Sequence, residues 1–454
     1  MATLDRLREI VKARRDPGVP VVADDAKHLP PARVGEGVAP ILDGRLHGSQ
    51  QYVKAALMLG GALLERPEGA VIVVDREYCA EMRHGHTAIG DIAATIHDGL
   101  DALRVMARAW PSAQGIDRRI LFLDLETTGL FGGAGTQAFL VGCAVLEGES
   151  IRIRQFLLPG FEHERAVLGQ FQEFAAAHGA LCTYNGRSFD VPLVETRFLF
   201  HRAPCPLDGL PHLDMLHAAR RLWRQRPLTM GTPDPDDSSC SLSVLEKHIS
   251  GMHRVGDVPG YEIPSRFFQF VRDGDARPLE AVLEHNRLDL ISLAAVLARA
   301  ITLITSGPSL AGTAQEAYGL ARVYERAGEY DNAEAALLRT IEFARRVGGE
   351  PEVQAEALRR LAWIRRRSRR LQEAAEAWQE LAALPRCAAS LRREATEALA
   401  IHHEHRSKNL DRARQHALEL LTDPAVNPAR VQHRLDRLER KLAQRSTDLL
   451  PIDY

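Results

Sequence analysis

A ten-residue segment at positions 120–129, Ile-Leu-Phe-Leu-Asp-Leu-Glu-Thr-Thr-Gly, most constrains how this chain can fold. It has the apolar composition of a buried strand but carries two carboxylates. Because successive side chains of a strand point to opposite faces, Phe122, Asp124 and Glu126 are expected on one side. Two carboxylates on one face can share a divalent ion. An isolated Asp-x-Glu pair is more often a solvated strand edge or an ion pair, so the metal interpretation depends on other segments.

Two further segments carry acidic residues in helical or turn contexts. Residues 183–192, Thr-Tyr-Asn-Gly-Arg-Ser-Phe-Asp-Val-Pro, are predicted to form a strand end and a turn that delivers Asp190 to the start of a helix. In residues 285–289, His-Asn-Arg-Leu-Asp, the spacing of four places His285 and Asp289 on one face of a helix. Asp190 alone could be a helix cap, and His285 alone a half-buried residue satisfied by a neighbour. The three segments together favour a metal site.

Hydrolysis of a phosphodiester explains why these residue types occur together. The reaction needs a nucleophile made from water near neutral pH and stabilisation of charge on the attacking and leaving oxygens, which two divalent ions supply. Hard ions prefer carboxylate oxygens, so the site suits two Mg²⁺ or Mn²⁺ ions. The predicted metal ligands are Asp124, Glu126, Asp190 and Asp289. His285 is predicted to be the general base, because the usual imidazole pKa of about 6.5 suits proton transfer from the attacking water.

These motifs resemble those of a known enzyme family. Residues 124–129, Asp-Leu-Glu-Thr-Thr-Gly, are similar to the first motif of the DEDD exonucleases of the ribonuclease H fold, and the resemblance spans roughly residues 117–300. Within it, residues 135–142, 212–216 and 241–246 resemble the bacterial branch described as YprB-type ribonuclease H-like proteins. Histidine-type members usually place five residues from the histidine to the last aspartate, whereas His285 stands at the spacing of four that is typical of tyrosine.

The resemblance implies a fold and a function. It implies an α/β ribonuclease H-like domain, a mixed sheet flanked by helices, and a 3′→5′ exonuclease that acts on single-stranded or frayed DNA in DNA repair, beside a helicase. Thr127 and Asn185 are expected near the substrate from their positions beside the motifs. An RNA-trimming exoribonuclease would share every catalytic residue and differ only in its contacts to the 2′-hydroxyl. A repeat-based scaffold or nucleic-acid binder with an incidental nuclease fold is a further alternative.

The predicted domain organisation has three parts. Residues 1–116 are an N-terminal extension with a hairpin at 61–74 and a helix at 89–110. Residues 117–303 are the ribonuclease H-like domain, and residues 313–445 are tetratricopeptide-like helical repeats. The expected strands of the central domain are 120–126, 138–146, 150–158, 181–184 and 212–214, with helices at 163–178 and 191–202.

The repeats are inferred from three sets of similar positions. Leu320, Tyr330 and Ala333 align with Leu361, Leu371 and Ala374, and these align with Ala400, Leu410 and Ala413, at offsets of 41 and 39 residues. Helix pairs with small residues at packing positions resemble tetratricopeptide repeats, whose usual period of 34 is shorter. Such solenoids usually bind protein partners, for which a helicase is the candidate.

Charge and composition limit the remaining possibilities. The 454 residues are 45% hydrophobic and 26% charged with a net charge of −2, and no run of 18 apolar residues occurs, so no membrane segment is expected. Six scattered cysteines form no CxxC pair, which argues against zinc or a disulfide framework. Residues 1–10 are typical of an amphipathic helix rather than a signal peptide, so a cytoplasmic location is expected.

The C-terminal region has an excess of positive charge. Residues 351–445 contain twenty Lys and Arg against thirteen Asp and Glu, including Arg-Arg-Arg-Ser-Arg-Arg at 365–370. This run could follow a phosphate backbone, or it could be the solvated C-terminal end of a helix, where cations complement the dipole.

Overall fold

The computed structural model describes residues 49–107, 110, 119–129, 135–223, 240–347 and 351–447. The amphipathic helix expected for residues 1–10 lies outside this part of the chain.

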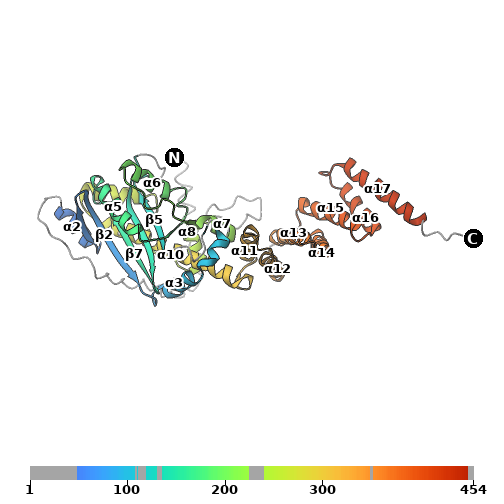
Figure 1. The fold of residues 1–454 in the computed structure, drawn as a ribbon, viewed down its shortest axis with the longest axis horizontal. Coiled ribbons are helices and arrows are strands. Elements are labelled where there is room, and N and C mark those ends of the chain that lie inside the picture. The colour runs from blue at the N-terminus through green and yellow to red at the C-terminus, as the bar shows by residue number, and fades with distance from the viewer. Residues whose placement is uncertain are drawn as a thin grey trace, which may run out of the picture. The chain divides into compact units, whose positions relative to one another are not determined.

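Within the described residues, seven strands form one sheet in the order β1-β2-β7-β6-β5-β8-β9, and Figure 1 shows β2 and β7 side by side. β8 pairs in parallel with β5 and with β9, whereas the other neighbours are antiparallel. The strands are β1 (Ala62–Arg66), β2 (Gly69–Tyr78), β5 (Ile120–Thr127), β6 (Ala138–Glu147), β7 (Ser150–Leu157), β8 (Ala180–Thr183) and β9 (His212–Asp214). The predicted mixed sheet is confirmed.

Helices connect and cover these strands. They are α2 (Ser49–Met58), α3 (Ile89–Asp98), α4 (Leu103–Met106), α5 (Glu164–Ala175), α6 (Asp190–Phe200), α7 (Met215–Leu222), α8 (Leu242–Ser250), α9 (Ile263–Asp273) and α10 (Arg277–Ser306), with short 3₁₀ turns at Leu100–Ala102, Phe161–His163 and Pro308–Leu310. A separate two-stranded ribbon is formed by β3 (Arg83–His84) and β4 (Thr87–Ala88).

The N-terminal hairpin joins the central sheet. The predicted hairpin is present as β1 and β2, and β2 pairs with β7 from Ile72 to Tyr78, so the sheet continues across the boundary expected at residue 116. The single helix expected at 89–110 is wrong, because α3 ends at Asp98. Gly99 follows it, and a Cβ there would lie 2.0 Å from Cγ2 of Ile301 in α10. Close packing against α10 therefore requires glycine at position 99, a residue that weakens a helix.

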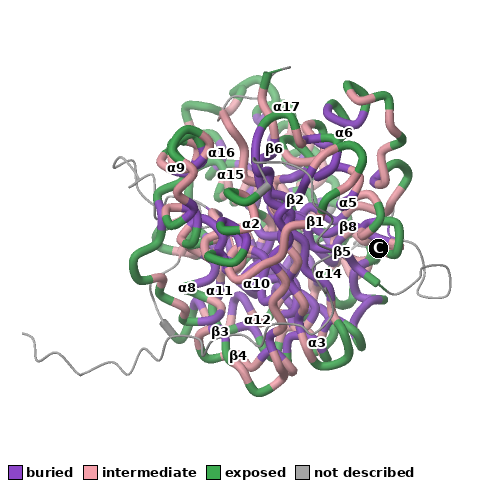
Figure 2. The backbone as a smooth tube through the Cα atoms, turned by 90° about the vertical axis from the view of Figure 1, so that its left-hand side faces the viewer, coloured by how far each residue is buried: buried purple, intermediate pink, exposed green. Residues whose placement is uncertain are grey.

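α5 and α10 cover opposite faces of the sheet. Gln155 and Phe156 are consecutive residues of β7, so their side chains point to different faces. The Gln155 amide donates to the carbonyl oxygen of Leu283 in α10 at 2.9 Å, whereas the Phe156 ring lies 5.9 Å from that of Phe174 in α5. Buried residues gather along the strands and along the helices that cover them (Figure 2).

α10 is the longest of the described helices and is apolar over most of its length. By length and composition it could cross a membrane, but 78% of its most apolar window is buried inside the protein. A core helix of a soluble protein meets the same criterion. Its burial between the sheet, α3 and α8 accounts for its apolar composition.

The C-terminal region consists of helix pairs. Its helices are α11 (Ala314–Ala327), α12 (Tyr330–Val347), α13 (Pro351–Arg367), α14 (Leu371–Ala383), α15 (Ala389–His405), α16 (Leu410–Leu421) and α17 (Pro428–Thr447). Tyr330, Leu371 and Leu410, which align in the sequence, each begin the second helix of a pair. The aligned alanines at 333, 374 and 413 are buried between helices. The predicted repeat is confirmed.

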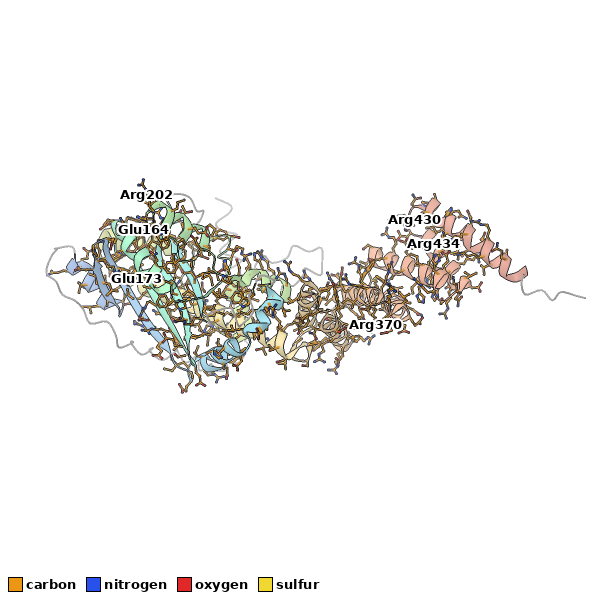
Figure 3. The ribbon with its side chains drawn as sticks, viewed as in Figure 1. Glu164, Glu173, Arg202, Arg370, Arg430 and Arg434 are labelled. Atoms are coloured by element: carbon orange, nitrogen blue, oxygen red, sulfur yellow. The ribbon has the colours of Figure 1, made fainter. Side chains whose placement is uncertain are left out.

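A buried ion cluster holds α5 against α6. Glu164 is buried and accepts hydrogen bonds from Arg197 Nε at 2.6 Å and from His201 Nε2, which lies 2.7 Å away. The side chains of Glu164 and Arg197 are only 4% and 5% exposed. Glu173 lies on the same helix but is 58% exposed, and it pairs with Arg66 at the surface (Figure 3).

Glu164→Gln should therefore destabilise the protein far more than Glu173→Gln. The first change breaks the buried ion pair of Glu164 and Arg197, which typically costs about 3–5 kcal/mol. The second removes an exposed pair worth about 0–1 kcal/mol. Urea unfolding of both variants measures the difference. Equal midpoints for the two variants would show that the buried cluster does not hold α6 in place.

Candidate functional site

The site is organised around a row of residues on three neighbouring strands. Asp124 of β5 lies opposite Gly142 of β6, and Gly142 lies opposite Gln155 of β7. All three face α10. Asn286 of α10 donates from Nδ2 to the Asp124 carboxylate at 2.8 Å and to its carbonyl oxygen at 3.2 Å, and its own Oδ1 accepts from Gln155 at 2.8 Å. Asn286 thus fixes the helix to the central strand.

Gly142 makes room for this amide. A Cβ at position 142 would lie 2.0 Å from Oδ1 of Asn286, so any larger residue would displace it. Asn286 is fully buried, and its amide could not be left without partners at low cost.

Asp190 is delivered by the turn that the sequence predicts. Asp214, at the end of β9, accepts backbone N–H groups of Asn185 at 2.8 Å and Arg187 at 3.1 Å, and also caps α7. Asn185 has φ +65°, a left-handed conformation that asparagine tolerates. The turn ends at Asp190, the first residue of α6, whose carboxylate accepts a backbone hydrogen bond from Leu125 of β5.

α10 supplies the other two predicted residues. His285 and Asp289 lie one turn apart, with His285 Nε2 3.6 Å from Asp289 Oδ2. His285 Nδ1 lies 2.7 Å from Asp257 Oδ1. Arg254 donates to Asp289 Oδ1 and, at 3.2 Å, to Asp257 Oδ2. One guanidinium therefore contacts the carboxylates on both sides of the histidine.

Arg254 is held by a buried polar network. It binds Glu246 with a closest distance of 2.7 Å, and Glu246 also accepts from Ser292. His84 Nε2 lies 2.9 Å from the Ser292 hydroxyl. Burial lowers the pKa of His84 to about 4, against the opposing charge of Glu246, so this histidine is neutral at pH 7. His84 therefore belongs to a buried structural network.

The carboxylates repel one another. Burial, followed by the charges of Asp289, Glu126 and Asp190, raises the pKa of Asp124 well above its usual range. Burial also raises the pKa of Glu126 to about 8, although the nearby His285 opposes the shift, and the pKa of Asp190 to about 7. Carboxyl groups that resist ionisation are thus gathered where β5, α6 and α10 meet.

The neighbouring carboxylates also affect the pKa of His285. Burial acts to lower the pKa of His285, but the hydrogen bond to Asp257 and the charges of Asp289 and Glu126 outweigh it and raise the pKa.

The donor set fits a hard divalent ion, although the side chains do not form a finished metal site. Four carboxylates are the ligands that Mg²⁺ and Mn²⁺ prefer, and their mutual repulsion is what a cation would relieve. Among the described residues, no three or more His, Cys, Asp or Glu side chains are arranged to hold an ion as they stand. The Arg254 guanidinium supplies positive charge to Asp289 in this conformation.

The remaining predicted residues lie beside this centre. Thr127 follows Glu126 across a β-bulge, and its hydroxyl donates to the carbonyl oxygen of Gly129 at 2.8 Å. Asn185 lies in the turn before Asp190. In contrast, Glu404 of the His-His-Glu-His run at 402–405 is buried and bound to Arg437 and Lys441, so its role is structural.

Comparison with known proteins agrees with this architecture. Residues 121–301 match the family described as RNase_H superfamily, and residues 313–385 match the tetratricopeptide repeat. Two consecutive regions of the chain are thus similar to a ribonuclease H-like domain and to tetratricopeptide repeats.

Two proteins are similar to parts of the chain. The uncharacterized protein YprB of Bacillus subtilis (strain 168) is 35% identical over 235 residues, covering 51% of this chain and 54% of that protein. The chain therefore matches about half the length of this relative, in keeping with a YprB-type family. The family B DNA polymerase from the archaeon Pyrobaculum calidifontis aligns with 51% of this chain and 29% of its own, at 15% identity. Its TM-score of 0.32 supports no conclusion.

The raised pKa of Glu126 predicts a pH-dependent penalty in the metal-free protein. A carboxyl group whose pKa rises from 4.5 to about 8 on folding contributes full stability below pH 4.5, and this contribution is lost as the pH rises to about 8. Glu126→Gln removes the ionisation. The variant should therefore melt above the parent protein at pH 8 in chelator, with a smaller difference at pH 5. A difference that is the same at both pH values would contradict the repulsion inferred for this site.

Proposed function

We propose that this protein is a divalent-metal-dependent 3′→5′ exonuclease that hydrolyses DNA at single-stranded or frayed ends, in the cytoplasm and in the service of DNA repair. The observation that carries the proposal is the arrangement of Asp124, Glu126, Asp190 and Asp289 on three separate elements, in which the charges of Asp190 and Asp289 raise the pKa of both Asp124 and Glu126. We assign the reaction to residues 117–303 and protein docking, for example to a helicase, to the repeats at 313–445.

The four carboxylates are the proposed ligands of two Mg²⁺ or Mn²⁺ ions. When bound, such ions would activate the attacking water and stabilise charge on the leaving oxygen. The carboxylates hold the ions, and Asn286 keeps Asp124 in place by its 2.8 Å hydrogen bond.

His285 is the proposed general base. The pKa of Asp257 is lowered: burial opposes ionisation, but the hydrogen bond with His285 and the charge of Arg254 favour it. An ionised Asp257 can only accept a hydrogen bond, so Nδ1 of His285 carries the proton and Nε2 is the acceptor. Nε2 points toward Asp289, on the side of the carboxylates. It is the atom that would take a proton from water.

Exposed groups beside Asp190 are suited to hold the terminal nucleotide. Phe189 is 61% exposed although it directly precedes Asp190. An exposed aromatic ring at this position can stack on a base without selecting its sequence. Thr127 and Asn185 are proposed to contact the same nucleotide from the other motifs.

The test is degradation of 5′-labelled substrates, namely single-stranded DNA, duplex DNA with frayed ends, and RNA, with Mg²⁺ or Mn²⁺. The parent protein should shorten DNA stepwise from its 3′ end and stop when chelator is added. Asp124→Asn should lose activity by several orders of magnitude. Its folding should be preserved, because an asparagine oxygen can still accept the hydrogen bond from Asn286.

Asp98→Asn is the matched control, since that carboxylate is 84% exposed. Full activity of Asp124→Asn would refute the site assignment, and shortening from the 5′ end would refute the polarity. Degradation of RNA alone would favour the exoribonuclease alternative. No degradation of any substrate would refute the nuclease.

A further inference from the structure

The arginine run at 365–370 divides into two groups. Arg365 donates to Glu334 at 2.9 Å and is only 15% exposed, and Arg370 binds Glu334 as well and Glu373 at 3.3 Å (Figure 3). These two side chains brace α13 against α12 and α14. Arg366 and Arg367, in contrast, are exposed and lie beside the rings of Trp363 and Tyr330. Arg365 and Arg370 therefore form ion pairs between helices, so neither interpretation of the run, a solvated helix end or a phosphate-binding strip, describes them.

Arg366 and Arg367 belong to a hollow of about 780 Å³ lined by residues of α7, α11, α12 and α13. We call it the arginine pocket. Its arginines are Arg221, Arg322, Arg326, Arg360, Arg366 and Arg367. Among its lining residues the only carboxylate is Glu325, which pairs with Arg360. The lining therefore carries a surplus of five positive charges, six minus one.

The positive charges act on one another. The pKa of Arg221 is lowered by burial and by the charges of Arg326 and Arg322. α7 packs directly on α11 here, because a Cβ on Gly319 would lie 2.2 Å from the carbonyl oxygen of Leu222. Mutual repulsion among arginines that are fixed by packing favours a bound anion.

Aromatic rings lie among the arginines. The Arg366 guanidinium lies 4.9 Å from the Trp363 ring, and that of Arg367 lies 4.7 Å from the Tyr330 ring. Trp363 is 44% exposed, and its Nε1 donates to Glu394 at 2.9 Å, which fixes the ring. Cations beside an exposed tryptophan ring held by a hydrogen bond match a single strand, whose phosphates need charge and whose bases need a stacking surface.

The pocket is continuous with the surface near the site. A second hollow of about 470 Å³ shares Arg221 and Arg326 with the arginine pocket and is also lined by Arg187, His212 and His217. Arg187 belongs to the turn that delivers Asp190 to the site. A strand whose 3′ end lies at the carboxylates could therefore follow this edge of the sheet to the repeats.

We propose that the arginine pocket binds the phosphate backbone of single-stranded nucleic acid, on the 5′ side of the nucleotide that is cleaved. This inference rests on the proposed function, and it assigns the first helices of the repeat region to substrate binding. The surplus of charge and the exposed tryptophan favour a nucleic acid over an acidic protein segment.

The test is binding of fluorescently labelled oligothymidylate by the full chain in chelator, where no cleavage takes place. The variant is Arg322→Gln/Arg366→Gln/Arg367→Gln. The control is Arg345→Gln/Arg346→Gln/Arg430→Gln, which removes the same charge from repeat arginines that are 58%, 67% and 72% exposed and lie outside the pocket. The two triple variants then have the same net charge and differ only in the positions from which the charge was removed.

The pocket variant should bind at least about tenfold more weakly than the control, and its log–log salt slope should fall by about 0.7 for each lost contact. With Mg²⁺ it should degrade a long strand slowly but a very short oligonucleotide at the parent rate. Equal affinities of the two triple variants would overturn the proposal. So would binding of polyglutamate, but not of oligothymidylate, that depends on the three arginines. Binding through the pocket by a protein that degrades nothing would support the pocket and refute the nuclease.

Discussion

The hydrogen bond from Asn286 to Asp124 connects the two halves of the candidate site. It joins the central strand to α10, and Gln155 on a third strand completes the contact. The position of α10 in turn determines where His285 and Asp289 lie, because they flank Asn286 within little more than one turn. Gly142 is required beneath this amide for steric reasons alone. The whole arrangement therefore depends on the buried side-chain amide of Asn286, which donates to Asp124 and accepts from Gln155.

Hydrogen bonds and ion pairs hold the acidic residues of the site in place, although burial and repulsion oppose their ionisation. Asp214 fixes the turn before Asp190, and the buried pair of Arg254 and Glu246 supports Asp289 from behind. Even so, burial and mutual repulsion raise the pKa of Asp124 and Glu126. Such a site lowers the stability of the metal-free protein. A bound cation would neutralise the carboxylates and relieve their repulsion. This is the expected compromise where a binding centre is built into a folded core.

The sequence was most informative where the signal is local. Alternation located β5 to within a residue, and the spacing of four placed His285 and Asp289 on one face of α10. The partners of these residues could not be predicted. Asp257 lies 28 residues before His285 and Arg254 lies 35 residues before Asp289, in a segment without regular periodicity, and only packing brings them to the site. Asn286 stood inside a recognised segment, but its role depends on Gly142 and Gln155 of other strands.

Tertiary packing also explains the errors elsewhere. The helix expected at 89–110 satisfies helical periodicity, yet α3 ends at Asp98, and the next residue, Gly99, packs so closely against Ile301 of α10 that no larger residue fits. The arginine run looked uniform, whereas Glu334 on the preceding helix pairs with Arg365 and Arg370 and leaves Arg366 beside Trp363. Charge counts along a sequence do not show which cations are already paired.

The central claim is that the carboxylates around the Asn286–Asp124 contact are metal ligands. A crystal structure of the protein soaked in Mn²⁺, with anomalous data recorded at the manganese edge, tests it most directly. The account predicts two manganese ions held among Asp124, Glu126, Asp190 and Asp289, with Asn286 still bound to Asp124. Manganese absent from Asp124 at saturating concentration, or bound only elsewhere, would contradict it.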